Sequence, residues 1–349
     1  MVVMPHPSPR AASMLVRSGC RSSRQQVLVP PRFFRRPSGA RYSGSTVLCH
    51  KALSRLVALG TPAATAALMR DAPGGVQVLL LQKAKNRRFG GNWVFPGGAF
   101  EDSDTTRGES GSINILATAA NAVARETTEE ARVHVHHDSL TFISHWLPPS
   151  DVNHRGGRKK YSTFFFCGTI NGPGGNERVD GCEIARYEWM RPADALERHA
   201  SGRLPLLPPT WMTLDLLRGT CSAGSCSGRR SSLQSAEGGE RLVGDVLQEL
   251  RSLHEPIAFE TRTACLPDGR MSYMFEGDAG WPTSDPSVSG PRFRLTATPR
   301  RSVDVAQDPQ TLSSLGLEAP DYSDRPVLAL ERSLTIASRN GTAIAANST

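Results

Sequence analysis

Acidic residues are missing from the first 70 positions of this 349-residue chain, which hold eleven Lys and Arg side chains and neither Asp nor Glu before Asp71. The rest of the chain carries 30 basic and 33 acidic residues, so its body is slightly acidic. The overall net charge of +8 therefore comes from one end of the chain. Because a nucleic-acid surface needs a basic surplus on the folded domain, we expect no nucleic-acid partner.

Long hydrophobic runs are also missing. The most apolar early stretch, Leu56 to Met69, is interrupted by Gly60 and Pro62, and no run reaches the 18 apolar residues typical of a membrane-spanning helix. The N-terminal region also lacks the apolar core of a secretory signal peptide. We expect no membrane partner.

Cysteine pairs are absent as well, although the chain holds seven cysteines. None forms a Cys-x-x-Cys pair. Cys221 and Cys226 flank a Ser/Gly-rich stretch and could be half of a zinc site, but no second pair lies nearby. Free thiols in a reducing compartment are the favoured interpretation.

Residues 1–55 form a leader that is rich in Arg and Ser and free of acid. This composition is typical of a mitochondrial transit peptide. A disordered basic tail or an over-extended gene start is the alternative. We expect a mitochondrial location, with a peroxisome-like organelle or the cytoplasm left open.

The most informative stretch runs from Gly90 to Val133, and its last third places Glu126, Glu129 and Glu130 at positions i, i+3 and i+4. On a helix these carboxylates share one face, about 5–6 Å apart between Cβ atoms. A divalent cation relieves repulsion between like charges, and hard oxygen ligands suit Mg²⁺ or Mn²⁺. The simpler interpretation is a solvated acidic face.

The surrounding residues predict that this stretch is helical. From Ile113, apolar side chains recur every three or four positions, and several alanines lie between them. The three glutamates fall beside the apolar stripe, about 115° around the helix. They would therefore line the edge of a cleft.

The loop before the helix favours the metal-binding interpretation. Phe95, Pro96, Gly97 and Gly98 follow a predicted strand at Val76–Leu81, and two consecutive glycines allow a sharp turn or a close approach. Strand, Gly-Gly loop and carboxylate helix together resemble the Nudix hydrolase box. The resemblance implies an α/β fold, a Nudix-type α/β/α sandwich with a mixed central sheet, plus a disordered leader and a C-terminal extension.

The chain departs from the family pattern at several places. Twenty residues instead of seven separate Asp104 from Arg125, and Asp104 stands where Glu is usual. Thr127 replaces an aliphatic residue, and Arg132 replaces a glycine. None of these changes removes a candidate metal ligand.

The resemblance implies roles for seven residues. Glu126 and Glu130 are the strongest metal-ligand candidates, and Glu129 is either a ligand or the general base. Arg125, paired with Asp104, would orient the catalytic helix. Gly97 and Gly98 would shape the loop beside the Mg²⁺ or Mn²⁺, which would bind diphosphate oxygens and lower the pKa of a water. The basic residues Lys83, Lys85, Arg87 and Arg88, just upstream, would add positive charge beside the phosphates.

Later segments sharpen the resemblance toward one subgroup. Trp146-Leu-Pro-Pro149, the Phe-rich strand ending at Cys167, Glu188-Trp-Met-Arg-Pro192 and Leu207-Pro-Pro-Thr-Trp211 occur in the order found in the peroxisomal coenzyme A diphosphatase type and its bacterial relatives. The implied substrate is coenzyme A or an acyl-CoA. A dinucleotide, an ADP-sugar, or a Nudix-like binding module without catalysis are the alternatives.

The predicted organisation has five parts. They are the leader at 1–55, the Nudix hydrolase domain at 56–218, a low-complexity linker or insert at 219–240, a C-terminal part packing on that domain at 241–298, and a partly disordered tail at 299–349.

Overall fold

The computed structural model describes most of the chain between residues 60 and 299 and short segments beyond it. The described residues are 60–135, 137–147, 149, 160–170, 177–179, 181–222, 241–253, 256–299, 326–332, 334–337 and 343–346. The predicted leader at 1–55 lies outside the described residues.

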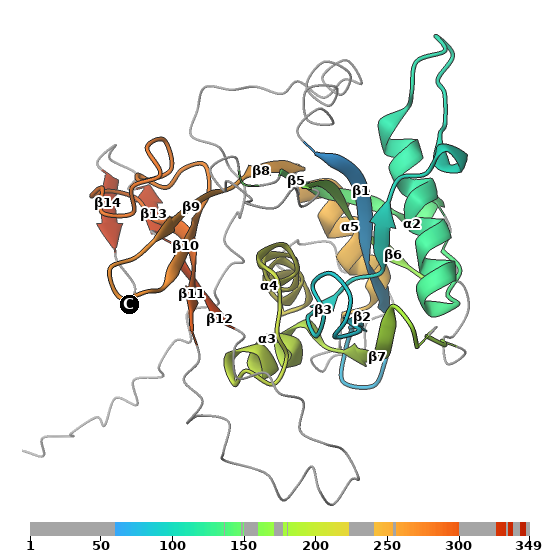
Figure 1. Cartoon of the computed structure of the whole chain (residues 1–349), viewed down its shortest axis with the longest axis horizontal. Coiled ribbons are helices and arrows are strands. Elements are labelled where there is room, and N and C mark those ends of the chain that lie inside the picture. The colour runs from blue at the N-terminus through green and yellow to red at the C-terminus, as the bar shows by residue number, and fades with distance from the viewer. Residues whose placement is uncertain are drawn as a thin grey trace, which may run out of the picture.

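A mixed sheet forms the centre of the molecule (Figure 1). Its strands run in the order β3-β2-β1-β6-β5-β8, with β4 paired to β1 and β7 paired to β2. The pairs β1–β6 and β5–β8 are parallel, and the other pairs are antiparallel. The strands are β1 (Thr61–Arg70), β2 (Gln77–Lys83), β3 (Trp93–Val94), β4 (Gly97–Ala99), β5 (Thr141–Leu147), β6 (Tyr161–Thr169), β7 (Ile184–Met190) and β8 (Ile257–Glu260).

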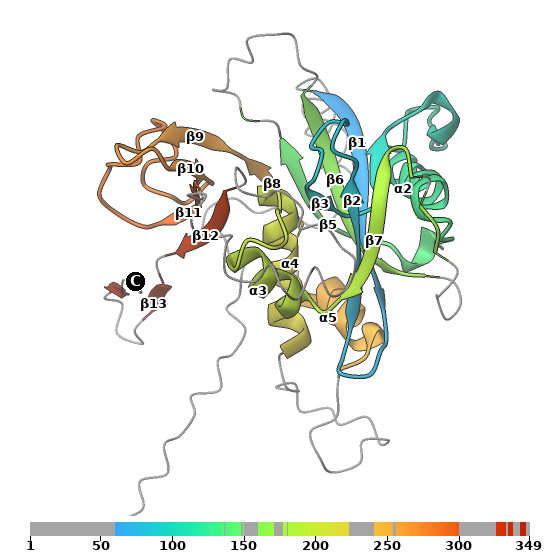
Figure 2. The same ribbon diagram turned by 60° about the horizontal axis from the view of Figure 1, so that its bottom comes forward.

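Helices cover both faces of this sheet. Helix α2 (Ile115–Ala131) lies on one face, and α3 (Pro192–Ala200), α4 (Pro208–Ser222) and α5 (Val243–Leu253) lie on the other (Figure 2). Alternation along β2 sends Leu79 and Leu81 into the core beneath α2, and Val78 and Leu80 into the core beneath the other helices. The predicted α/β/α sandwich with a mixed sheet is confirmed.

Local signals fix both ends of α2. The side chain of Asn114 caps the first turn by accepting a hydrogen bond from the Ala117 amide at 3.2 Å. At the other end Arg132 adopts a left-handed conformation with φ 57°, and its amide donates to the carbonyls of Thr127 and Thr128. The position where the family pattern has glycine thus keeps the glycine-type conformation, although an arginine occupies it.

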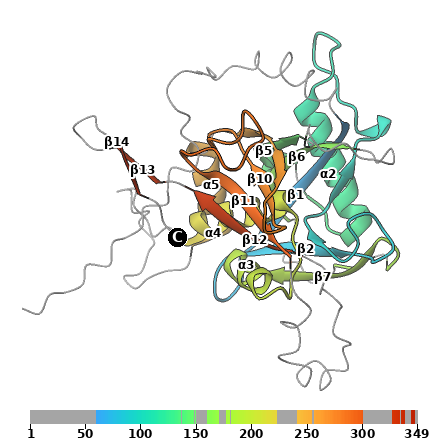
Figure 3. The same cartoon turned by 60° about the vertical axis from the view of Figure 1, so that its left-hand side comes forward.

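A second sheet lies on the side of α3 and α4, away from α2 (Figures 1 and 3). Its antiparallel order is β12-β11-β10-β9. Trp146 of β5 stacks on Phe259 of β8 with ring centroids 4.2 Å apart, and both rings contact Phe275. The strands are β9 (Arg262–Cys265), β10 (Met271–Met274), β11 (Phe293–Thr298) and β12 (Val327–Arg332), followed by the pair β13 (Leu334–Ala337) and β14 (Ala343–Ala346).

One histidine joins the last strand of this sheet to the helical layer. His199, on α3, is buried, and its Nδ1 lies 2.9 Å from the Leu204 carbonyl. Its Nε2 accepts the Leu328 amide of β12 at 2.7 Å. The neutral ring with its proton on Nδ1 satisfies both bonds.

One predicted boundary needs correction. The low-complexity segment was expected to begin at Gly219, but Gly219 to Ser222 form the end of α4. Residues 223–240 lie outside the described residues. The edge strand β8, which belongs to the predicted C-terminal part, completes the central sheet. Among the described helices, none is long and apolar enough to cross a membrane.

Candidate functional site

Arg125 and Asp104 form the rigid base of the site. The guanidinium donates to the two carboxylate oxygens of Asp104 from Nε at 3.1 Å and from Nη2 at 3.0 Å. Nη2 also donates to the Ala99 carbonyl at 2.9 Å. Asp104 is 3% exposed and also accepts the Glu101 amide. The structure therefore brings this predicted pair together, although Asp is one methylene shorter than the usual Glu.

The first turns of α2 hold the long connection that separates Asp104 from Arg125. Asn121 donates to the Asp104 carbonyl and to the Thr106 hydroxyl, both at 2.8 Å. The Thr106 amide donates to Thr118 at 3.1 Å. Because the added residues bond to added helix, Asp104 returns to the side of Arg125 despite the extra chain length.

Two glycines bring the loop backbone against α2 and β1. A Cβ at Gly97, whose φ is 150°, would lie 2.2 Å from the Ala64 carbonyl oxygen. A Cβ at Gly98 would lie 2.1 Å from Oε1 of Glu126. Only glycine therefore lets this loop approach both its strand neighbour and the carboxylate.

Glu130 is the most buried of the three glutamates, with 6% of its side chain exposed. Its Oε2 accepts the Gly97 amide at 2.9 Å. Its Oε1 lies 2.7 Å from Nζ of Lys83, which also lies 3.0 Å from Oε1 of Glu183. One basic residue predicted to stand beside the site thus contacts a predicted ligand directly.

Arg125 engages the other two glutamates. Its Nη1 lies 3.0 Å from Glu126 Oε1 and 3.1 Å from Glu129 Oε2. Glu126 is largely buried, whereas 59% of the Glu129 side chain is exposed. Among the described residues, no three His, Cys, Asp or Glu side chains lie together ready to hold a metal ion. Arg125 contacts Glu126 and Glu129, whereas Lys83 contacts Glu130.

The electrostatics nevertheless favour an added cation. Burial, followed by the negative charge of Glu130, raises the pKa of Glu126 to about 7. Burial also raises the pKa of Glu130, against the opposing effects of Lys83 and the Gly97 amide. For Lys83, burial is the largest effect and acts to lower the pKa, but the charges and hydrogen bonds of Glu130 and Glu183 together outweigh it and raise the pKa overall. Two carboxylates with raised pKa values, beside a glycine that leaves space, fit a divalent cation.

Hydrogen bonding to Asp104 is the largest effect on Arg125, and it raises the pKa of that guanidinium. Arg125 therefore stays charged at every pH at which the protein is folded. The site keeps one permanent positive charge beneath the carboxylates.

Sequence reasoning missed Glu183. It precedes β7 and lies one hundred positions after Lys83, so no local pattern connects the two. The remaining predicted basic residues do not reach the glutamates. Arg87 donates to the Cys182 carbonyl at 3.4 Å, and the Arg88 guanidinium lies over the rings of Phe89 and Tyr161.

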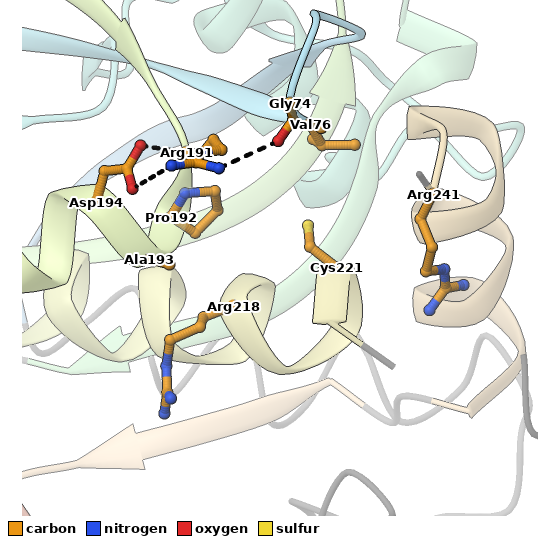
Figure 4. A pocket seen from close by; sticks show the side chains of 10 residues that line it. Gly74, Val76, Arg191, Pro192, Ala193, Asp194, Arg218, Cys221 and Arg241 are labelled. Carbon is orange, nitrogen blue, oxygen red and sulfur yellow. Dashed lines mark hydrogen bonds and ion pairs between the residues drawn. The ribbon is translucent and has the colours of Figure 1, made fainter. Parts of the chain in front are cut away.

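A separate cavity of about 270 Å³ lies between the β1–β2 turn and the helices of the opposite layer. Three arginines line it, and none of its lining residues belongs to α2. Arg191 points toward Asp194 and the Gly74 carbonyl, whereas the Arg218 side chain points away from these three residues (Figure 4). Arg218 pairs with Asp215, and Arg241 pairs with Glu249. Since each guanidinium has a carboxylate partner, the glutamates of α2 remain the better candidate site.

A comparison with protein-family models decides the family of this region. Residues 60–209 match the model of the NUDIX domain. This region is a Nudix domain. The match confirms the predicted Nudix fold and supports the predicted Nudix hydrolase, and it spans all seven predicted site residues. A search of curated proteins found no match to the chain.

Several solved structures resemble the chain at low sequence identity. A Nudix hydrolase from Alicyclobacillus acidocaldarius is 24% identical, with 45% of this chain and 90% of that chain covered and a TM-score of 0.37. The Nudix domain of Shewanella oneidensis NrtR, solved with ADP ribose, is 18% identical, with 45% and 84% covered and a TM-score of 0.32. An Ap4A hydrolase from C. elegans is 21% identical, with 46% and 93% covered and a TM-score of 0.29. At these TM-scores, the family assignment rests on the domain match.

Proposed function

We propose that this protein hydrolyses a diphosphate linkage in a nucleoside diphosphate derivative, with Mg²⁺ or Mn²⁺ as cofactor. The observation that carries this proposal is the pair Glu126 and Glu130, one turn apart on α2 of a Nudix domain and both with raised pKa values. Like charges buried this close are stabilised by a cation between them. Gly98 leaves the Glu126 carboxylate open to the loop.

The reaction adds water across a phosphorus–oxygen bond. Water forms a new bond to one phosphorus, the bridging P–O bond breaks, and two phosphate monoesters and a proton result. A bound divalent cation would supply charge neutralisation for the diphosphate and a lower pKa for the attacking water. Glu126 and Glu130 would hold it, while Arg125 fixes the helix through Asp104. Glu129, which is mostly exposed, would be a third ligand or would accept the proton.

Coenzyme A or an acyl-CoA is the proposed substrate. The support is the sequence resemblance of the segments around Trp146, Trp189 and Trp211 to the coenzyme A diphosphatase subgroup. The products would be 3′,5′-ADP and a phosphopantetheine. A dinucleotide or an ADP-sugar is the alternative within the same reaction class.

The test incubates the full-length purified chain with coenzyme A, ADP-ribose and a diadenosine polyphosphate, each with Mg²⁺, Mn²⁺ or EDTA. Products are separated by chromatography and identified by mass. We expect 3′,5′-ADP from coenzyme A, with metal, and none in EDTA. The Glu130→Gln variant should lose this activity, whereas Asp268→Asn, which removes an exposed carboxylate from the distant β9–β10 turn, should keep it.

Each other result has a definite meaning. Turnover of ADP-ribose or the dinucleotide but not coenzyme A would support the proposed reaction class and reject coenzyme A as the substrate. Inactivity toward the whole panel, with the protein folded by circular dichroism, would favour a Nudix-like binding module.

A further inference from the structure

Nζ of Lys83 lies 2.7 Å from Oε1 of Glu130, one of the two oxygens with which this residue could bind a cation. The side chains of β2 alternate, so Leu79, Leu81 and Lys83 point toward α2. The first two enter the core, and the third, at the strand end, reaches Glu130 with only 12% of its side chain exposed. The lysine is thus held in place by the same pattern that builds the core.

The two oxygens of Glu130 have different partners. Oε2 accepts the Gly97 amide, which belongs to the fixed loop, and Oε1 accepts Lys83. A Mg²⁺ ion binds carboxylate oxygens at about 2.0–2.1 Å. An ammonium group at 2.7 Å from the same oxygen would lie against such an ion and repel it. The lysine and a divalent cation therefore compete for Oε1.

Glu183 offers the lysine a second partner. Its carboxylate already lies 3.0 Å from Nζ, and 52% of its side chain is exposed. Its backbone is anchored, because the Ala84 amide donates to the Glu183 carbonyl at 2.8 Å. An irregularity in the β2–β7 pairing lies between Gln82 and Lys83, next to this contact. Nζ can thus leave Glu130 without losing a carboxylate partner.

We propose that Lys83 is the built-in counter-ion of Glu130 in the metal-free protein, and that Glu183 takes over its ammonium group when a divalent cation binds. Lys83 and Glu183 are then positioning residues that set metal affinity. This inference rests on the proposed ligation of a metal by Glu130, but it does not depend on which diphosphate is hydrolysed.

The test is a double-mutant cycle read out by Mn²⁺ binding and by metal-free stability. Free Mn²⁺ is measured by electron paramagnetic resonance for the wild-type chain, Lys83→Gln, Glu183→Gln and the double variant. Thermal unfolding of each is followed in EDTA. Lys83→Met provides a second lysine variant without a hydrogen-bond donor.

We expect Lys83→Gln to bind Mn²⁺ about five- to tenfold more tightly, because the competing charge is gone, and to unfold at a lower temperature in EDTA. Glu183→Gln should bind Mn²⁺ several-fold more weakly and keep nearly wild-type stability in EDTA. In the Lys83→Gln background, Glu183→Gln should change the Mn²⁺ affinity little, because there is no longer a lysine ammonium group for Glu183 to bind. Glu188→Gln, which removes a partly exposed carboxylate from β7, should leave affinity unchanged.

Three results would overturn the proposal. One is an equal effect of Glu183→Gln on Mn²⁺ affinity with and without Lys83, which would mean that the Glu183 charge attracts the metal ion directly through space. Another is unchanged Mn²⁺ affinity in both lysine variants. The third, no Mn²⁺ binding by any variant, would also remove the metal-dependent function. If the cycle behaves as expected but no diphosphate is hydrolysed, only the proposed function fails.

Discussion

Two buried clusters of charged side chains in this protein differ in how completely their carboxylates are hydrogen-bonded. In the loop between β10 and β11 of the second sheet, Asp278 accepts hydrogen bonds from the amides of Gly280 and Phe293 and from two guanidinium nitrogens of Arg294. Burial acts to raise the pKa of Asp278, but these bonds outweigh it and hold the pKa below its usual value. On α2, Glu126 has one arginine and two carboxylate neighbours, and its pKa rises to about 7.

The difference separates a structural carboxylate from one suited to binding. Because Asp278 is fully hydrogen-bonded, its carboxylate has no oxygen lone pair left for a ligand. Its role is therefore to stabilise the fold. The glutamates of α2 outnumber their cationic partners, and either a proton on Glu126 or an added cation would balance the excess negative charge. Satisfaction of hydrogen bonds, more than burial, distinguishes the two clusters.

Breaking the Asp278 cluster should give the largest effect. Asp278→Asn leaves the Arg294 guanidinium, whose side chain is 4% exposed, without a counter-charge. We expect a loss of about 3 kcal/mol or more in the free energy of unfolding, measured by urea titration. Hydrolytic activity per folded molecule should stay unchanged, and a loss of activity at full folding would contradict the division between the clusters.

Replacing one glycine in each cluster with alanine should lower activity in one cluster and stability in the other. In Gly98→Ala the new methyl meets only the end of the flexible Glu126 side chain, so we expect a folded protein whose activity falls about 100-fold as the carboxylate is displaced. In Gly280→Ala the methyl meets the Asp285 backbone carbonyl at 2.2 Å, so stability should fall instead. Rates at saturating metal and unfolding curves for both variants check this, and similar behaviour of the two would refute it.

The pH dependence of stability should differ in sign between the clusters. Glu126 has a folded-state pKa raised above its unfolded value, so its contribution is full at acid pH and is lost as the pH rises through about 7. In EDTA, Glu126→Gln should therefore melt about 2–5 °C above wild type at pH 8 and show little difference at pH 4. Asp278, with a lowered pKa, should lose its contribution as the pH falls.

Saturating Mn²⁺ gives the control for this pH series, because a bound cation would stabilise ionised Glu126 and remove the advantage of glutamine. Melting curves from pH 4 to pH 8, with and without metal, supply the measurement. A lower melting temperature for Glu126→Gln at pH 8 in EDTA would show that Glu126 is not destabilised by its charge.

Lengthening the Asp104 side chain should give the smallest effect. Asp104→Glu adds one methylene at a position 3% exposed, where the carboxylate already meets Arg125 with two hydrogen bonds. We expect about 1 kcal/mol of destabilisation and less than tenfold loss of activity. A gain in both properties would mean that the connection to α2 accommodates the family's usual glutamate.

Local patterns predicted much of this structure. An apolar run and glycine placement indicated β2 and the loop at Gly97, and the helical period placed the three glutamates on one face of α2. The Asp104–Arg125 pairing came from the family resemblance, because its partners are separated by a segment of unusual length. The Lys83–Glu130 contact joins residues 47 positions apart, and the edge strand β8 is remote from its partner β5. Such contacts depend on the packing of the whole sheet, which a local pattern does not contain.

The late arrival of β8 has a consequence for synthesis on the ribosome. Strand β5 ends at Leu147 and β8 begins at Ile257, about 110 residues later. At about 5–20 residues per second, the growing chain waits roughly 5–20 s before its own edge strand exists. During that interval one side of β5 exposes unpaired backbone groups, which are a template for pairing with another chain. The edge of β5 is therefore a point at which newly made chains can pair with one another until β8 covers it.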